Sequence, residues 1–250
     1  MSDEPLGSAA TIKPLVMITG ASAGIGAATA RAFAGAGYPL LLLARRPREL
    51  HGLGLPNAVC VQADVRDRAS IAAAVAEGER VYGPVDCLIN NAGIAPLARL
   101  EDQDPEEWRD LLDINCLGVM NVMQPLMRAM KSRRHGTIIN VSSIAGRKSY
   151  PYHDAYGGSK AFVHNLSEGA RRSMAPYNVR VILVSPGLTR TTIEQTMLNE
   201  EARAIWLERG AEIGGGISAD HVAQTMLFAY QMPQSVILQE LTITPTLQEY

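Results

Sequence analysis

Tyr156 and Lys160 have the residue types and the spacing of an acid-base pair. Four residues separate them, so on a helix their side chains lie on the same face, close enough for an ammonium group to act on a phenol. An ordinary tyrosine has a pKa of about 10, and a nearby positive charge favours the phenolate and lowers that pKa. A YxxxK pair also occurs by chance on amphipathic helices, so it predicts general acid-base chemistry only together with other groups.

Ser143 is the first of these other groups. It ends the apolar segment TIINVSS, thirteen residues before Tyr156. Asn90, Asn91, Ala92 and Gly93 end another apolar segment, VDCLINNAG. If both segments are strands of a parallel sheet, their carboxyl ends face the same crevice. The serine hydroxyl could then donate to a substrate oxygen beside the tyrosine.

A glycine-rich turn follows the first apolar segment, LVMIT. Glycines at such a turn let the backbone approach a pyrophosphate, and the N-terminus of the next helix offers unpaired N–H groups to the anion. The spacing is GxxxGxG, whereas the commonest dinucleotide fingerprint is GxGxxG, and the alternative is a tight turn without a ligand. The predicted cofactor-binding residues here are Gly20, Ser22, Ala23, Gly24, Ile25 and Gly26.

The end of the second apolar segment predicts which dinucleotide is bound. An enzyme that uses NAD places a carboxylate there to accept from the ribose 2′-OH. This chain has Arg45 and Arg46 instead, and guanidinium groups suit a 2′-phosphate. We therefore expect NADP rather than NAD, although both arginines could also be solvated loop residues.

The elements that position these residues follow a regular order. Short segments that are apolar on both faces alternate with longer segments of helical period, which indicates a parallel sheet covered by helices on both sides. The strand candidates are LVMIT, PLLLLA, AVCVQAD, VDCLINNAG, TIINVSS, VRVILVSPG and VILQELTIT. The sequence predicts a single α/β domain over 15–250, a Rossmann-type doubly wound parallel sheet of about seven strands, after a flexible tail over 1–14.

The helices have recognisable start and stop signals. Between Asp104 and Gly136 we expect one long helix, with a capping box at Asp104 and Glu107, a kink at Pro125 and a terminal cap at Gly136. A second helix is predicted over 156–174, and a helical region of uncertain limits over 192–232.

Composition excludes several classes of partner. The formal net charge is -2, which gives no electrostatic reason to expect nucleic acid or an anionic membrane. The three cysteines show no metal-ligand spacing, so we expect reduced thiols and no metal site. The acidic N-terminus does not resemble a signal peptide, and no apolar run approaches the ~20 residues that span a bilayer, so a cytoplasmic location is expected.

Taken together, these motifs resemble those of the short-chain dehydrogenase/reductase family. They comprise TGASAGIG at 19–26, Asp64 with Val65, NNAG at 90–93, Asn115, Ser143, Tyr156 with Lys160, and PGLTRT at 186–191, in the order and spacing of that family. The resemblance implies that Tyr156 is the acid-base residue, that Lys160 lowers its pKa and binds the nicotinamide ribose, and that Ser143 polarises the substrate oxygen. Asn115 would hold a water molecule in a proton relay, or else mark a local helix kink without chemistry.

The same resemblance assigns further cofactor contacts. Asp64 and Val65 would lie at the adenine, and Asn91 and Gly93, with Ala92 between them, near the ribose. Pro186, Gly187, Thr189 and Thr191 would lie around the nicotinamide, and Tyr156 and Lys160 are cofactor-binding residues as well. Thr189 replaces the usual branched apolar residue of the family. The family resemblance also implies a homotetramer or homodimer that forms through the helices near 104–132 and 156–174. In these helices apolar residues occur on more than one face.

The substrate is less defined than the chemistry. The ending ELTITPTLQEY resembles that of dehydrogenases that act on 3-hydroxy acids with NADP, such as serine or allo-threonine, with Ser143 and Tyr156 as the substrate-binding residues. The alternative is a reductase of 3-oxoacyl, steroid-like or other bulky carbonyls. Arg147, Lys148, His153 or Arg190 could anchor an acidic substrate, or could be solvated. A third possibility, from another class, is a cofactor-binding sensor without turnover, which the intact tyrosine and lysine disfavour.

Overall fold

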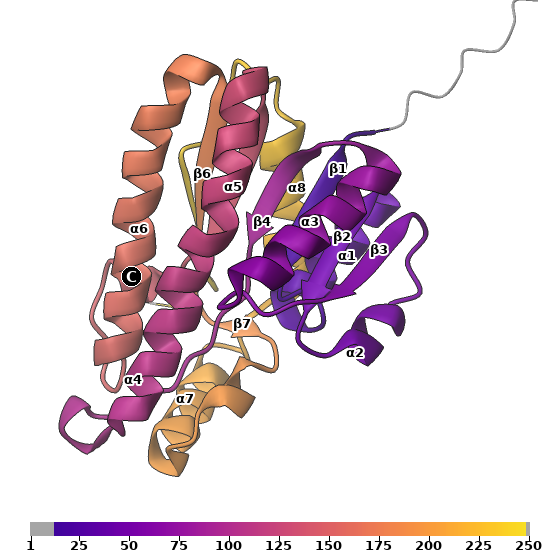
Figure 1. Cartoon of the computed structure of the whole chain (residues 1–250). Helices are drawn as coiled ribbons and strands as arrows, with labels where there is room; N and C mark the ends of the chain where they lie inside the picture. The colour runs from indigo at the N-terminus through magenta and orange to yellow at the C-terminus, as the bar shows by residue number, and fades with distance from the viewer. Residues whose placement is uncertain (1–12, 249–250) are drawn as a thin grey trace, which may run out of the picture.

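The computed structural model describes residues 13–248, and its centre is a parallel β-sheet (Figure 1). Within the described residues this sheet has seven strands in the order β3-β2-β1-β4-β5-β6-β9. Their bounds are β1 (Leu15–Thr19), β2 (Leu40–Ala44), β3 (Ala58–Gln62), β4 (Val85–Asn90), β5 (Gly136–Val141), β6 (Val179–Pro186) and β9 (Glu240–Ile243). All pairs are parallel, which confirms the predicted doubly wound fold. The strand order reverses between β1 and β4, where such folds form their ligand crevice.

Helices cover both faces of the sheet. One layer contains α3 (Arg68–Tyr82), α5 (Gly118–Arg133) and α6 (Asp154–Met174), and the other contains α1 (Gly24–Gly35) and α8 (Ala219–Gln231) (Figure 1). The run of leucines in β2 is buried in both layers, because Leu41 and Leu43 pack on one side and Leu40 and Leu42 on the other. The sequence of β2 therefore shows no polar alternation, whereas β9 at the sheet edge, ELTI, alternates polar and apolar residues.

The expected long helix between Asp104 and Gly136 is interrupted. It consists of α4 (Pro105–Leu112), a π-helical segment (Asp113–Leu117) and α5. Our expectation of a kink at Pro125 alone is therefore incomplete, because Pro125 lies inside α5 and the change in helical geometry occurs around Asn115. Single π-helical turns often mark functional sites.

The ends of this helical stretch also differ from the predicted caps. Asp104 accepts from Glu106 N (2.9 Å), but the Glu107 carboxylate accepts from Gln103 Nε2 (3.0 Å), so the reciprocal half of the capping box is not made. At the other end Arg134 takes the left-handed conformation, with φ of 53°, and Gly136 is already the first residue of β5.

The smaller elements complete the chain. They are α2 (Pro47–His51), α7 (Glu200–Glu212), the short pair β7 (Thr189–Arg190) and β8 (Ile217–Ser218), and 3-10 turns at Leu100–Asp102, Ile144–Gly146, Ala175–Tyr177 and Ile193–Thr196. The predicted helical region over 192–232 is thus divided between α7 and α8. Of the predicted tail, residues 1–12 lie outside the described residues. Among the described residues, the helices are too short or too polar to cross a membrane.

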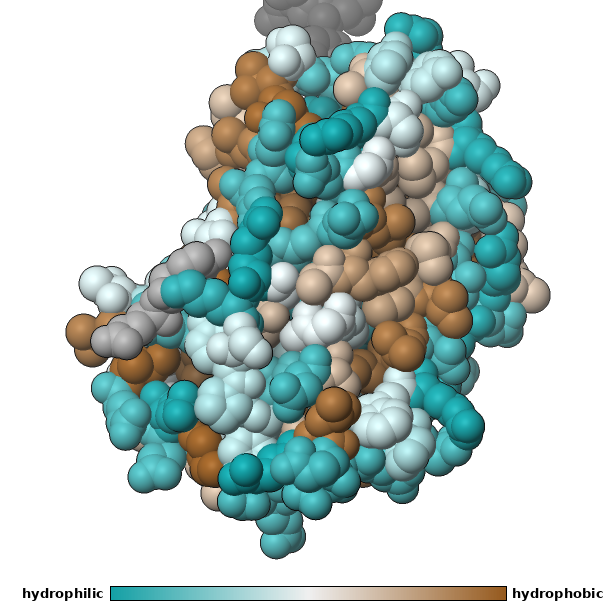
Figure 2. Space-filling model, turned by 90° about the vertical axis from the view of Figure 1, so that its left-hand side faces the viewer, coloured by the Kyte–Doolittle hydropathy of each residue, from teal (hydrophilic) through white to brown (hydrophobic). Residues whose placement is uncertain are grey.

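The outer surface of α4 and α6 carries some exposed apolar side chains. Figure 2 views the molecule from this side and shows apolar groups scattered among hydrophilic ones. Leu112, Leu117 and Phe162 are exposed, whereas Leu111, Ile114, Val119, Val122 and Met123 are buried within the protomer. Ordinary core packing therefore accounts for most of the apolar residues that the sequence showed on several faces of this region.

Candidate active site

A cavity of about 1280 Å³ opens at the carboxyl ends of the strands. It brings together residues that the sequence predicts from several separate segments, as expected for the crevice of a doubly wound sheet. The predicted site residues that line it are Gly20, Ser22, Ala23, Gly24, Ile25, Arg45, Arg46, Asp64, Val65, Asn91, Ala92, Gly93, Ser143, Tyr156, Lys160, Pro186, Gly187, Thr189 and Thr191. Gly26 and Asn115 do not line the cavity and lie behind its wall.

The glycine turn has the geometry of a close backbone approach. Gly20 and Gly24 adopt positive φ values of 64° and 52°, which favour glycine. A Cβ added to Gly26 would lie 2.2 Å from Gly20 O and 2.5 Å from Asn91 Nδ2. Gly26 therefore permits α1 to pack on the turn, and it does not itself line the cavity. Within residues 13–248 no side chain caps the N-terminus of α1, so its N–H groups remain directed at the cavity.

Asn91 holds this turn in place from β4. Its Nδ2 donates to Thr19 O and Gly20 O (both 3.1 Å), and the Thr19 hydroxyl accepts from Asn91 N and Ala92 N (both 3.1 Å). The side-chain amide of Asn91 is thus used within the protein, and its place in the cavity wall comes from its backbone segment. The carboxyl ends of β1 and β4 are fixed to each other at the strand-order reversal.

Buried Tyr156 and Lys160 and half-buried Ser143 lie together in the lining of the cavity. Ser143 follows β5 and its Oγ accepts from Ala145 N (3.1 Å), while Tyr156 and Lys160 lie on one face of α6. The Lys160 Nζ lies 5.8 Å from the centre of the Tyr156 ring and donates to Val141 O (3.2 Å). The three side chains that could perform proton chemistry are therefore neighbours.

Burial dominates the ionisation of this group. It raises the pKa of Tyr156 to about 12, an effect that a hydrogen bond with Ser143 partly opposes. It lowers the pKa of Lys160 to about 8. The expectation that Lys160 lowers the pKa of Tyr156 is therefore not met by the protein groups of this site. At neutral pH the site holds a neutral phenol and a lysine close to its titration range.

Asn115 lies in the π-helical segment, and both polar atoms of its side chain form hydrogen bonds within the protein. Its Oδ1 accepts from Ile94 N (3.0 Å), and its Nδ2 donates to Ile94 O (2.9 Å) and Ser159 Oγ (3.2 Å). A Cβ added to Gly93 would lie 3.2 Å from Asn115 Oδ1 and 3.7 Å from Lys160 Nζ. Asn115 therefore lies directly behind the cavity wall beside Lys160, and it ties α4 and α5 to the segment after β4.

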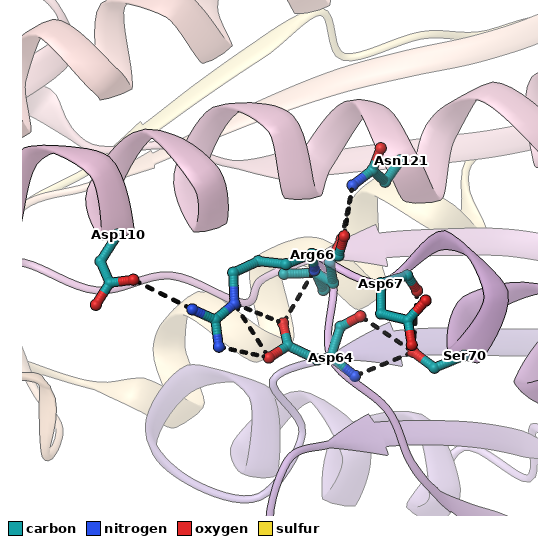
Figure 3. A network of polar contacts seen from close by, with 7 residues as sticks. Asp64, Arg66, Asp67, Ser70, Asp110 and Asn121 are labelled. Carbon is teal, nitrogen blue, oxygen red and sulfur yellow. Dashed lines mark hydrogen bonds and ion pairs between the residues drawn. The ribbon is translucent and has the colours of Figure 1, made fainter.

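Asp64 belongs to a polar network that the sequence did not reveal (Figure 3). Arg66 Nε and Nη2 donate to its carboxylate oxygens at 2.8–3.2 Å, and Arg66 Nη1 reaches Asp110 Oδ1 (3.1 Å) on α4. This ion pair holds the pKa of Asp64 below its usual range, with a smaller contribution from Arg45. The adenine end of the predicted site is therefore bounded by a carboxylate already paired with Arg66.

Arg45 and Arg46 differ in their surroundings. Both are exposed at the cavity mouth beside the end of β2. Arg46 Nε forms an ion pair with Glu49 Oε1 (3.2 Å) on α2. Both side chains are exposed, so solvent screening weakens this ion pair. Arg45 lies near enough to lower the pKa of Asp64. Both guanidinium groups could meet an anion at the cavity mouth.

The far end of the cavity is built by residues outside the predicted set. They come from the loop before α6 and from α7: Tyr150, Pro151, Tyr152, Ile205, Trp206, Glu208, Arg209 and Glu212. The apolar residues of α7 show little helical periodicity, and no local pattern marks its residues as facing the crevice. Leu247 and Gln248 also line the cavity, and Gln248 Oε1 accepts from Leu188 N (2.9 Å).

The four basic residues considered as substrate anchors separate into two groups. Lys148 and His153 line the cavity. Arg147 is not part of the lining and donates to Glu240 on β9, with Nε 2.9 Å from Glu240 Oε1. Arg190 lies outside the lining as well and donates to Gly216 O (2.6 Å). The structure thus leaves Lys148 and His153 as candidates.

Comparisons with known proteins identify the family of this chain. The family described as short chain dehydrogenase matches residues 14–202. A sulfoacetaldehyde reductase of Chromohalobacter salexigens is 34% identical over 94% of this chain and 95% of its own, and a serine 3-dehydrogenase of Rhizobium radiobacter is 31% identical over 94% and 95%. The closed form of a serine dehydrogenase complexed with NADP+ superimposes with a TM-score of 0.88 at 29% identity, covering 94% of this chain and 96% of the other. The chain therefore belongs to the short-chain dehydrogenase family.

Proposed function

We propose that this protein is an NADP(H)-dependent oxidoreductase that interconverts an alcohol and a carbonyl compound by hydride transfer. The observation that carries the proposal is the convergence of Ser143, Tyr156 and Lys160 on the cavity that the glycine turn also lines. At about 1280 Å³ the cavity exceeds the usual 300–1,000 Å³ of a small-molecule site, so it has room for a dinucleotide together with a substrate.

Tyr156 is the proton donor to the carbonyl oxygen during reduction. Because burial holds its pKa at about 12, the phenol keeps its proton at neutral pH until negative charge develops on the substrate oxygen. Ser143, which hydrogen-bonds to Tyr156, lies where its hydroxyl would donate to the same oxygen. A dinucleotide held by the glycine turn would supply the hydride for the carbonyl carbon.

Lys160 returns a proton to the site after each reduction. Its pKa of about 8 lies close to neutral pH, so its ammonium group can lose and regain a proton readily. Asn115 Oδ1 and Lys160 Nζ both lie beside Gly93, which supports a route for protons between them through a water molecule. In the oxidative direction Tyr156 first passes its own proton to Lys160, and the resulting phenolate then accepts the proton of the alcohol.

The preference for NADP rests on several features of the cavity. Arg45 and Arg46 lie at the mouth, where they would meet a 2′-phosphate, and β2 ends without a carboxylate. A similar solved structure is a serine dehydrogenase complexed with NADP+. For the cofactor, we assign the glycine turn to the pyrophosphate, Asp64 and Val65 to the adenine, and Pro186, Gly187, Thr189 and Thr191 to the nicotinamide end.

The substrate we favour is a small hydroxy acid or its carbonyl partner. Two relatives are named for serine and for sulfoacetaldehyde, and both of these compounds have an anionic group near the reacting carbon. Lys148, His153 and Arg209 line the cavity and offer cationic or polar groups to such an anion. The size of the cavity favours a second candidate, a bulky carbonyl such as a 3-oxoacyl compound.

Replacement of Tyr156 tests the proposal. We expect Tyr156→Phe to bind NADPH as the wild type does and to lose turnover, because the ring remains and the proton donor is removed. Tyr177→Phe is the matched control, since Tyr177 follows the far end of α6 and stacks with Lys131. Initial rates are measured with NADPH and NADH across a panel of hydroxy acids and ketones. Full turnover of Tyr156→Phe on the best substrate would refute the mechanism.

We also propose that the chain forms a homodimer or homotetramer. The exposed Leu112, Leu117 and Phe162 on the outer surface of α4, the π-helical segment and α6 support this. Light scattering on the purified protein distinguishes monomer, dimer and tetramer. A monomer at all concentrations would exclude the assembly.

A further inference from the structure

His164 is a buried histidine that the proposed chemistry does not use. It lies on α6 one turn after Lys160, and its side chain is 8% exposed. Above it runs the 3-10 turn Ile144–Gly146, which begins directly after Ser143. A Cβ added to Gly146 would lie 2.7 Å from His164 Cδ2, so the turn and the imidazole are in close contact.

The imidazole contacts the backbone of Ser143 itself. His164 Nε2 lies 3.2 Å from Ser143 O and 3.3 Å from Ser185 Oγ. Because a carbonyl oxygen only accepts hydrogen bonds, this contact assigns the proton to Nε2. Among the described residues Nδ1 has no hydrogen-bond partner, and it lies 3.9 Å from Glu240 Oε1. Burial lowers the pKa of His164, which agrees with a neutral imidazole that donates from Nε2.

The charged groups around His164 are occupied elsewhere. Glu240 on β9 accepts from Arg147, the residue after the 3-10 turn, and Lys160 donates to Val141 O. The turn is therefore held at two points, at its start by His164 and just after its end by the pair of Arg147 and Glu240. Of these two contacts, the one with His164 is made to Ser143 directly.

We propose that His164 is a positioning residue for Ser143, through the hydrogen bond from its Nε2 to the Ser143 carbonyl. This inference rests on the proposed role of Ser143 as a donor to the substrate oxygen. The Ser143 backbone is extended, with φ of −165° and ψ of 156°. The side chain of Ser143 forms a hydrogen bond with Tyr156, and its carbonyl oxygen accepts from His164. If that carbonyl rotates, the hydroxyl moves with it, and a displacement of about 1 Å at a reacting group can cost about 100-fold in rate.

A matched pair of substitutions tests this role. The amide nitrogen of glutamine reaches about as far as Nε2 of histidine, whereas that of asparagine is one methylene shorter. We expect His164→Gln to keep kcat within about threefold of the wild type, and His164→Asn to lower kcat by about 10- to 100-fold. NADPH affinity, measured by titration of its fluorescence, should change little in either variant, because His164 does not line the cavity. The thermal midpoint is recorded for both.

The same pair in a Ser143→Ala background separates positioning from simple packing. The Ser143→Ala variant has no hydroxyl that His164 could position. We therefore expect equal single-turnover rates for His164→Gln and His164→Asn in this background. Equal kcat of the two variants when Ser143 is intact, or a gap between them that persists in the Ser143→Ala background, would overturn the inference. So would a lower thermal midpoint of His164→Asn with unchanged kcat. Full turnover of Ser143→Ala alone would instead refute the proposed role of Ser143, whatever the variants at 164 show.

Discussion

Replacing Lys160 by methionine should make the folded protein more stable at neutral pH. The lysine is buried, and burial lowers its pKa from 10.5 to about 8. At pH 7 the folded state therefore carries an ammonium group at a cost that the unfolded chain does not bear. The difference between these pKa values, at about 1.4 kcal/mol per pH unit, corresponds to about 3 kcal/mol. Methionine has a similar length and no charge to bury.

The sign of the pH dependence follows from proton binding. Between pH 8 and 10.5 the unfolded chain keeps the lysine proton while the folded state loses it, so the wild type gains stability as pH rises through this window. The advantage of Lys160→Met over the wild type should therefore shrink by about 2 kcal/mol between pH 7 and pH 9.5. Cys60 and Cys87, whose pKa values burial raises, titrate in both proteins and largely cancel in this difference. Burial also raises the pKa of Cys116, but the charge of Lys160 opposes this shift, so the comparison is made with Cys116→Ser in both proteins.

Urea unfolding followed by tryptophan fluorescence measures this difference, at one protein concentration and at both pH values. Lys131→Met is the control, because Lys131 is exposed on α5 and the same substitution there removes no buried charge. A stability advantage of Lys160→Met that is the same at pH 7 and pH 9.5 would refute the reasoning. The variant should also lose turnover, as expected when a buried functional charge is removed.

Three further perturbations have defined outcomes. Gly26→Ala should lower the free energy of unfolding by about 1–3 kcal/mol or prevent folding, because its Cβ would lie 2.2 Å from Gly20 O; urea unfolding checks this, and wild-type stability would contradict it. Arg45→Ala should raise KM for NADPH by about tenfold and leave KM for NADH unchanged; equal changes for both cofactors would exclude a 2′-phosphate contact. Tyr230→Phe removes the donor to Asp86 Oδ2 (2.7 Å) and should cost about 1–3 kcal/mol of stability, which thermal unfolding would show as a lower midpoint; no change would mean that Asp86 finds another donor.

The sequence alone determined the sheet and the centre of the candidate site. Apolar segments such as LLLLA in β2 predict buried parallel strands, because both faces of each strand must be covered. The carboxyl ends of parallel strands share one edge, so Ser143 after β5 and the glycine turn after β1 could be placed at the same crevice from their order in the chain. Tyr156 and Lys160 needed only the helical period.

The tertiary structure alone decided the features that depend on distant neighbours. The π-helical segment at Asn115 arises where that side chain bonds Ile94 and Ser159, which lie far from it in the sequence. Arg66 pairs with the carboxylate of Asp64, and residues of α7 line the far end of the cavity. No local sequence pattern predicts either contact. The sequence also did not predict the direction of the Tyr156 pKa shift. The spacing shows that Lys160 is near, but only the packed structure shows how completely the phenol and the ammonium group are removed from water.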